Sequence, residues 1–225
     1  MNPNSTGRPD IEALLKPFKT AVDQLWTAVA LDSRSEARSS TVLITGVNEH
    51  AGASTVAVCT ATGLAHHLLV PTVLVETHDG DGSIANLFGL PQSPGLGEVL
   101  EGNLDLSDAA VETGIPNLKV VPYGHHRHGG LSAAALHELF DELTQQFRYV
   151  VLDAPPILDD AHTRVMLRYV NRALLVLEAQ KSSQDRAQRA IEMIEQQPSV
   201  ELIGTVLNKY KAEAPSWLIP SKFSA

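Results

Sequence analysis

The sequence predicts an α/β fold, a doubly wound and mainly parallel sheet with helices on both faces. Short apolar runs recur along the chain, and they are continuous rather than alternating, as in strands that are covered on both faces. Longer stretches that are compatible with helix separate these runs. Strand–helix alternation of this kind implies parallel strands that are joined by right-handed crossovers.

The elements are expected in a regular order along the chain. Six runs rich in Val, Ile and Leu predict strands at 41–45, 72–76, 118–122, 149–153, 173–177 and 202–207. The stretches between them predict helices near 53–69, 132–147, 160–170 and 183–197. Because ligands bind outside the carboxyl ends of the strands in such sheets, candidate site residues are sought in the loops that follow each run.

The chain divides into three expected parts. Residues 1–40 contain an amphipathic segment at 11–30, with apolar residues at helical spacing, and a polar link. We interpret this segment as a helix packed on the sheet, with a partner-binding or self-association element as the alternative. Residues 41–209 form the expected α/β domain, and residues 210–225 form a C-terminal tail.

Composition excludes several classes of partner. The 225 residues include 17 Lys and Arg against 26 Asp and Glu, a formal net charge of −9. Nucleic acid or an anionic membrane would require a concentrated positive surface, so neither is expected as a direct partner. Cys59 is the only cysteine, which fits a reducing compartment and a cytoplasmic location. The most apolar stretch, 56–70, contains His66 and His67, so no membrane span is expected.

The loop after the first expected strand is a degenerate match to a phosphate-binding loop. A P-loop reads G-x-x-x-x-G-K-[ST], in which backbone N–H groups surround phosphate, the lysine neutralises it and the hydroxyl binds Mg²⁺. Gly52, Ser54 and Thr55 stand where the last glycine and the hydroxyls belong, but Ala53 replaces the lysine. These four residues are the candidate nucleotide-binding residues, and Glu49 adds a negative charge nearby. An ordinary strand–helix turn is the alternative interpretation.

Asp153 is the candidate catalytic carboxylate. It ends the apolar run at 149–153, and so lies at the carboxyl end of an expected strand. A Walker-B aspartate occupies this place and holds Mg²⁺ directly or through water. Ser54 and Asp153 are therefore candidate metal ligands, on the condition that Mg-nucleotide binds.

Five segments, taken jointly and in order, carry a family resemblance. They are FGL at 88–90, GLGEVLEG at 95–102, LKVVPYG at 118–124, VVLDAPPIL at 150–158 and GTVLNK at 204–209. Together they resemble the catalytic domain of the bacterial tyrosine kinases (BY-kinases) of capsule and exopolysaccharide synthesis, within the wider Min/Par-type P-loop ATPase group. The resemblance covers the chain from about Ser39 to Lys209 and implies a P-loop NTPase-like fold.

The chain also departs from the pattern that the resemblance implies. The second metal-binding segment of the family carries two aspartates one residue apart, and the matching residues here are Glu76 and His78. Glu76 joins Ser54 and Asp153 as a candidate metal ligand, whereas imidazole is a poor ligand for a hard cation. Asn208 matches a position that contacts the adenine base in relatives. Of the C-terminal tyrosine cluster of the family, Tyr210 alone lies near the end of this chain.

The joint loss of these parts predicts a pseudokinase, a non-catalytic BY-kinase-like accessory or regulatory protein of exopolysaccharide biosynthesis or export. The resemblance implies an inner-membrane polysaccharide co-polymerase as its partner, through which it would be held at the membrane. No cofactor is expected. The alternative is an active ATPase or tyrosine kinase that uses ATP and Mg²⁺, with Lys181, Lys209 or an arginine of a partner supplying the missing charge. A Min/Par-type positioning ATPase is a second alternative, and self-association is left open.

A histidine-rich segment at 125–128 is the last candidate. Its three imidazoles can be considered as a zinc site, but a glycine-rich loop without a nearby cysteine favours a solvated loop.

Overall fold

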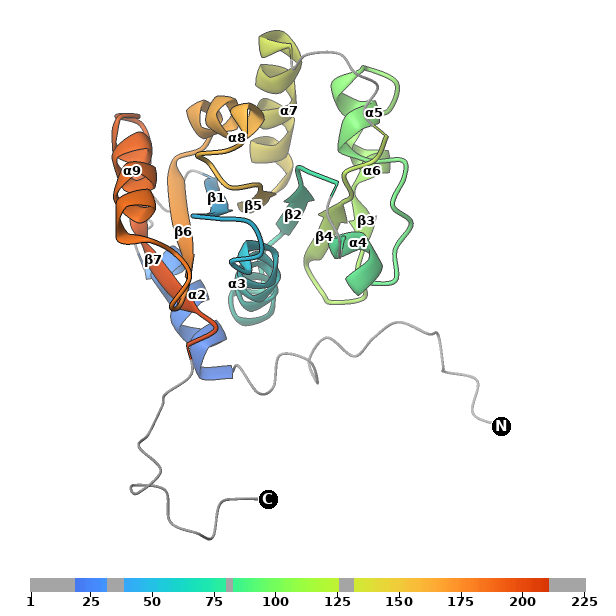
Figure 1. The fold of residues 1–225 in the computed structure, drawn as a ribbon. Coiled ribbons are helices and arrows are strands. Elements are labelled where there is room, and N and C mark those ends of the chain that lie inside the picture. Colours follow the sequence, from blue (N-terminus) through green and yellow to red (C-terminus); the bar gives the residue numbers. More distant parts are fainter. Residues whose placement is uncertain (1–18, 32–38, 80–82, 126–131, 211–225) are drawn as a thin grey trace, which may run out of the picture.

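A seven-stranded sheet forms the centre of the computed structural model, which describes residues 19–31, 39–79, 83–125 and 132–210 (Figure 1). The strand order is β3-β4-β2-β5-β1-β6-β7. The strands are β1 (Ser40–Gly46), β2 (Thr72–Glu76), β3 (Val111–Glu112), β4 (Leu118–Val121), β5 (Tyr149–Ala154), β6 (Arg172–Glu178) and β7 (Glu201–Asn208). The pairs are parallel except for β3 with β4, which is antiparallel. The predicted mainly parallel α/β fold is therefore confirmed.

Helices cover both faces of this sheet. They are α2 (Lys19–Leu31), α3 (Ala53–Leu68), α4 (Ile84–Leu87), α5 (Leu96–Leu100), α6 (Leu106–Ala109), α7 (Ala133–Gln146), α8 (Ala161–Met166), the 3-10 turn η2 (Leu167–Tyr169) and α9 (Gln184–Glu195). Two apolar clusters lie on opposite sides of the strands: Val42 and Ile44 of β1 pack with α2, α3 and α4, while Leu43 packs with α5 to α9. Successive side chains of a strand point to opposite faces of the sheet, so a strand that is apolar along its length contributes side chains to both clusters.

The predicted elements agree with the observed ones except where an element is very short. Each of the six expected runs is a strand, and each of the four expected helices is present within a few residues. The two-residue strand β3 and the short helices α4, α5 and α6 were not predicted. Four or five residues are too few for a helical period to be visible in a sequence, so these helices leave no pattern.

The described part of the amphipathic segment near the N-terminus packs mainly on helix α3, whereas the first interpretation expected it to pack on the sheet. Residues 19–31 of it are helical, and residues 11–18 lie outside the described part. Trp26 lies on Gly63 so closely that a Cβ atom at residue 63 would be 2.6 Å from its Cδ1 atom. The same indole stacks on His67, with ring centroids 4.8 Å apart, and His67 pairs with Asp23. Because Gly63 has no side chain, Trp26 of α2 can pack directly against α3.

Gly63→Val is expected to lower the free energy of unfolding by about 2 kcal/mol, because a branched side chain would displace the Trp26 ring from its place on α3. Urea denaturation measures this difference. In a Trp26→Ala background, the same substitution is expected to cost less than half as much, since the clash is gone. An equal cost in both backgrounds would contradict the proposed role of Gly63.

Candidate active site at the carboxyl ends of β1, β2 and β5

The carboxyl ends of three adjacent strands bring the predicted site residues together. In the parallel register Asp153 of β5 lies beside Ile44 of β1 on one side and beside Glu76 of β2 on the other. The loop after β1 leads into α3, whose second residue is Ser54. The Ser54 side chain forms a hydrogen bond with the Asp153 carboxylate. The structure thus assembles Ser54, Glu76 and Asp153 from three separate segments, as the sheet topology implies.

The β1–α3 loop, residues 47–52, ends at a glycine that no other residue can replace without strain. Gly52 has a φ of 95° and a ψ of 27°, in the left-handed region, and precedes the first residue of α3. A Cβ atom at this residue would also lie 2.1 Å from Nδ2 of Asn208. No side chain caps α3, and its first turn carries no acidic residue. The free N–H groups at this helix end therefore favour an anion.

Four side chains hold the β1–α3 loop from its outer side, and we call them the loop clamp: Ser182, Arg186, Asn208 and Lys209. Arg186 donates two hydrogen bonds to the Val47 carbonyl, at 3.1 and 3.2 Å, and the Ser182 hydroxyl donates to the side-chain oxygen of Asn48 at 2.5 Å. Lys209 donates to the His50 carbonyl at 2.6 Å, and the Asn208 amide donates to the Ala51 carbonyl at 2.9 Å. The clamp comes from the connection between β6 and α9, from the start of α9 and from the end of β7 with the residue after it, all remote in sequence from the loop. The loop therefore has its conformation without the lysine that Ala53 replaces.

Asn208, the candidate adenine contact, belongs to this clamp. Its amide nitrogen donates a hydrogen bond to the Ala51 carbonyl. Its amide oxygen accepts a hydrogen bond from the backbone N–H of Lys209 at 2.8 Å. A role for Asn208 in binding a base stays a prediction. Such a role would require its amide to keep or exchange these contacts.

The two lysines considered as substitutes for the missing one share a single carboxylate. Lys181 Nζ lies 2.8 Å and Lys209 Nζ lies 3.3 Å from Oε1 of Glu178, at the end of β6. The hydrogen bond from Lys181 holds the pKa of Glu178 below its ordinary value, with a further contribution from Lys209. Both ammonium groups are therefore already paired in this structure.

Asp153 is a buried carboxylate with one oxygen left without a partner. It is 1% exposed, and its Oδ1 atom accepts no hydrogen bond within the described part of the chain. Burial raises the pKa of Asp153 to about 6; His78 and the Ser54 hydrogen bond oppose this rise, and the charge of Glu76 adds to it. A buried polar atom that lacks a partner costs free energy, and strongly shifted carboxyl groups are frequent at functional sites. Asp153 therefore remains the strongest candidate for a functional carboxylate.

Glu76 differs from the expectation of an available metal ligand. Its carboxylate accepts the backbone N–H of Ile84 at 2.7 Å, the hydroxyl of Ser83 at 3.1 Å and the backbone N–H of Tyr123 at 3.4 Å. It is 3% exposed. Glu76 thus anchors the start of α4 and the exit of β4, and sequence could not reveal these contacts because Ile84 and Tyr123 are only brought to it by folding.

The described residues supply some of the groups that a Mg-nucleotide site needs and lack others. Ser54 supplies a hydroxyl, Asp153 an unpaired carboxylate oxygen, and α3 its N-terminal N–H groups. Ala53 supplies no charge for the phosphates, and no group of three His, Cys, Asp or Glu side chains among residues 19–31, 39–79, 83–125 and 132–210 is placed to hold a metal ion. This set therefore does not fit a Mg-nucleotide as a P-loop enzyme holds one. In the histidine-rich segment His125 is exposed, and residues 126–131 lie outside the described part.

The fold is that of the P-loop NTPases, and comparison with known proteins shows which of them this chain is similar to. No protein-family model matches the sequence. The chain is 27% identical to the tyrosine-protein kinase CpsD of Streptococcus agalactiae over 192 residues, which are 83% of this chain and 82% of CpsD. It is also 27% identical to the putative tyrosine-protein kinase EpsB of Ralstonia solanacearum over 207 residues, 89% of this chain but 26% of EpsB.

Solved structures with a similar fold include the same kind of protein. The kinase domain of the Escherichia coli tyrosine kinase ETK superposes with a TM-score of 0.79 at 21% identity, covering 94% of this chain and 84% of that one. The cell-division protein MinD of Aquifex aeolicus gives a TM-score of 0.62 at 18% identity, over 77% of this chain and 70% of MinD. The homologues are thus bacterial tyrosine kinases, and the fold is that of BY-kinase domains and MinD-type P-loop ATPases. Within the described residues, helices long and apolar enough to span a membrane are absent.

Proposed function

We propose that the chain is a non-catalytic, BY-kinase-like accessory or regulatory protein of exopolysaccharide biosynthesis or export, which acts on the cytoplasmic side with an inner-membrane polysaccharide co-polymerase. One observation carries the proposal: the β1–α3 loop is held by the loop clamp, while Ala53 stands where the phosphate-neutralising lysine belongs. The scaffold of a kinase domain is present without the charge on which its chemistry depends.

Electrostatics support the non-catalytic part of the proposal. Phosphoryl transfer depends almost wholly on positioning and on stabilisation of charge, and the loss of one such donor costs about a hundred- to a thousandfold in rate. Lys181 and Lys209 are both paired with Glu178, so neither is available without breaking an ion pair. Glu76 is occupied by backbone donors. The phosphate-neutralising charge and the acidic metal segment of a kinase site are therefore both altered.

The relatives support the partnership. CpsD and EpsB are both named tyrosine-protein kinases, and in EpsB the region like this chain is 26% of a longer protein. A domain of this kind is therefore joined to a large further sequence in that relative. We infer the same association for this chain, with a co-polymerase as the membrane component that it regulates.

A complementation experiment tests the proposal. In a strain that lacks the gene for this chain, exopolysaccharide output is expected to fall and to be restored equally by the wild-type chain and by Asp153→Ala. The co-polymerase, solubilised in detergent, is expected to co-purify with both forms, with or without added ATP. Failure of a folded Asp153→Ala variant to restore output would show that catalysis is required, and failure of the wild-type chain to retain the co-polymerase would contradict the partnership.

The buried Asp153 specifically favours one alternative, an active ATPase or tyrosine kinase with unorthodox residues. A carboxylate that is 1% exposed and has an unpaired oxygen is costly to keep if it does nothing. In this alternative an arginine from a partner would supply the missing charge in trans. Phosphate release from ATP that appears only with the co-polymerase and disappears in Asp153→Ala would establish it.

A further inference from the structure

Two neighbouring strand ends each carry a buried side-chain atom that lacks a hydrogen-bond partner within the described part of the chain. The atoms are Oδ1 of Asp153, near the end of β5, and Nδ1 of His78, two residues after β2. Asp153 is 1% exposed and His78 is half-buried. A buried polar atom without a partner costs free energy, and both of these atoms can offer a lone pair to a proton donor or a cation. The pair therefore indicates a ligand between the two strand ends.

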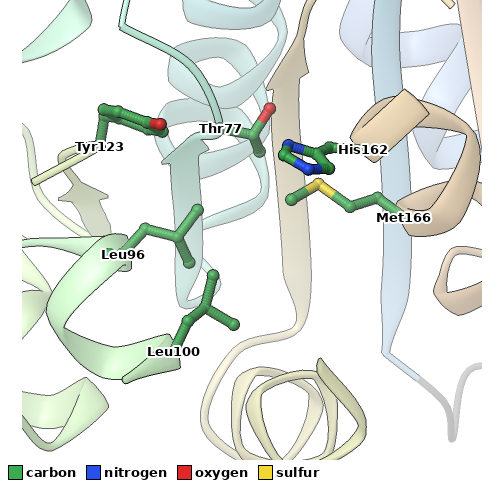
Figure 2. Close-up of a pocket in the computed structure, with 7 residues that line it drawn as sticks. Thr77, Leu96, Leu100, Tyr123, His162 and Met166 are labelled. Carbon is green, nitrogen blue, oxygen red and sulfur yellow. The ribbon is translucent and has the colours of Figure 1, made fainter. Parts of the chain in front are cut away.

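His78 lies on the face of the sheet that α3 covers. The residue before it, Thr77, donates its backbone N–H to the Asp153 carbonyl at 3.1 Å, so the pairing of β2 with β5 continues to residue 77. The Thr77 side chain lies on the opposite face, where it lines a small pocket with Leu96 of α5 and Met166 of α8 (Figure 2). Because successive side chains of a strand point to opposite faces, the His78 imidazole points to the side of α3.

The Asp153 carboxylate lies on the same face as His78. Its neighbours in β5, Leu152 and Ala154, belong to the apolar cluster on the side of α5 to α9, so the side chain between them points to the side of α3. The Ser54 side chain, at the start of α3, bonds to this carboxylate. Burial raises the pKa of Asp153, and the charge of His78 opposes this rise, as a neighbouring cation does. The two unpartnered atoms therefore lie on one face, at adjacent strand ends.

The chemistry of these two atoms selects the kind of ligand. Neither atom serves as the partner of the other, since each lacks a hydrogen-bond partner. Glu76, which lies beside Asp153 in the pairing of β2 with β5, adds negative charge and so favours a cation. One imidazole nitrogen and one carboxylate oxygen suit zinc and the transition metals near it, whereas Mg²⁺ takes oxygen ligands. His78 therefore turns the donor set away from Mg²⁺ and toward a transition metal.

We infer that Asp153 and His78 bind a divalent transition-metal ion of the zinc class, with Oδ1 of Asp153 and Nδ1 of His78 as its side-chain ligands. Within residues 19–31, 39–79, 83–125 and 132–210, no group of three His, Cys, Asp or Glu side chains is placed to hold a metal ion, so water completes the coordination. An ion at this place joins β2 to β5 only when the chain is folded, and it therefore stabilises the folded state. Neither a nucleotide nor the co-polymerase is needed for this binding.

Calorimetric titration of the purified chain with ZnCl₂, without nucleotide, tests the inference. The starting protein carries His125→Asn, His126→Asn and His128→Asn, which removes the imidazoles of the histidine-rich segment. One Zn²⁺ per chain is expected to bind with a dissociation constant on the order of 10 μM, and Mg²⁺ at least about a hundredfold more weakly. In this background His78→Gln is expected to weaken Zn²⁺ binding at least about tenfold, since even residues that only support a metal ligand contribute that much. His162→Gln, at an exposed position of α8, is the matched control and is expected to bind Zn²⁺ as the background does.

A second variant and a second measurement separate a lost ligand from a changed fold. His78→Asp keeps a metal ligand but makes it an oxygen, and it is expected to reduce the preference for Zn²⁺ over Mg²⁺ at least about tenfold. Zn²⁺ is expected to raise the melting temperature of the His162→Gln protein saturably and to leave that of the His78→Gln protein unchanged. No saturable binding of Zn²⁺ below about 1 mM, equal binding by His78→Gln and His162→Gln, or an unchanged metal preference in His78→Asp would overturn the inference. ATP is absent from every titration, so none of these outcomes bears on the proposed loss of catalysis.

Discussion

Replacing Ala53 with lysine is expected to create a nucleotide-binding protein. The wild-type chain is expected to bind ATP with Mg²⁺ no better than millimolar, and Ala53→Lys about a hundredfold more tightly, because one cation placed at a prepared phosphate site is worth that much. The loop clamp already holds the β1–α3 loop, and Gly52 already has the left-handed conformation from which α3 begins. The new lysine would therefore need no rearrangement of the backbone. Isothermal titration calorimetry measures the change.

A matched variant separates a specific cation from a general change of charge. Glu49→Gln lies in the same loop, is exposed and changes the net charge by the same amount without adding a cation. It is expected to leave ATP binding within about twofold of the wild type, since exposed charges are strongly screened. If Ala53→Lys folds normally but gains no more than Glu49→Gln, the loop is not in a phosphate-binding conformation. The side chain of Asn208, which lies over Gly52, would then be closing the site.

Asp153→Asn is expected to stabilise the protein by about 3 kcal/mol at pH 7.5. Burial raises the pKa of Asp153 from 3.8 to about 6, so the folded state binds the proton more tightly than the unfolded state does. Each unit of such a difference is worth about 1.4 kcal/mol. The wild type therefore loses stability as the pH rises from about 4 to about 6, and the full cost of the ionised carboxylate is present above pH 6. The asparagine variant avoids that cost.

Urea denaturation at several pH values checks this expectation. The gain from Asp153→Asn is expected to be nearly complete at pH 7.5 and to become small at pH 4, where the carboxyl group is protonated in the folded wild type. Asp141→Asn, in an exposed part of α7, is the control and is expected to change the free energy of unfolding by no more than about 0.5 kcal/mol at either pH. A variant that is less stable than the wild type at pH 7.5 would contradict an unpaired, ionised Asp153.

Most of the sheet could be predicted because its signal is local. The runs that form β1, β2 and β5 are buried along their whole length, so their apolar character is unbroken in the sequence. Strand β3 is two residues long, one half-buried and one exposed, and leaves no such signal. The approach of Asp153 to Glu76 and Ser54 follows from topology alone, since parallel strands end at the same edge.

The rest of the site depends on contacts between segments that are far apart in the sequence. Arg186 belongs to no motif, and the GTVLNK segment that contains Lys209 does not show what this lysine contacts. Only folding shows that both side chains donate to carbonyl groups of the β1–α3 loop. Glu76 stands at the expected position, but its role as an anchor depends on donors from Ile84 and Tyr123. The small pocket between α5 and α8 is equally invisible in the sequence, because α5, α8 and two strand ends each contribute only part of its wall.

The proposed loss of catalysis is tested most directly by titrating the purified wild-type chain with ATP in the presence of Mg²⁺, by calorimetry, and by measuring phosphate release in the same samples. A protein without the lysine at residue 53 and with Lys181 and Lys209 both paired to Glu178 is expected to show no saturable heat at micromolar ATP and no phosphate release above background. Micromolar binding together with turnover that disappears in Asp153→Ala would contradict a non-catalytic protein and establish an active enzyme.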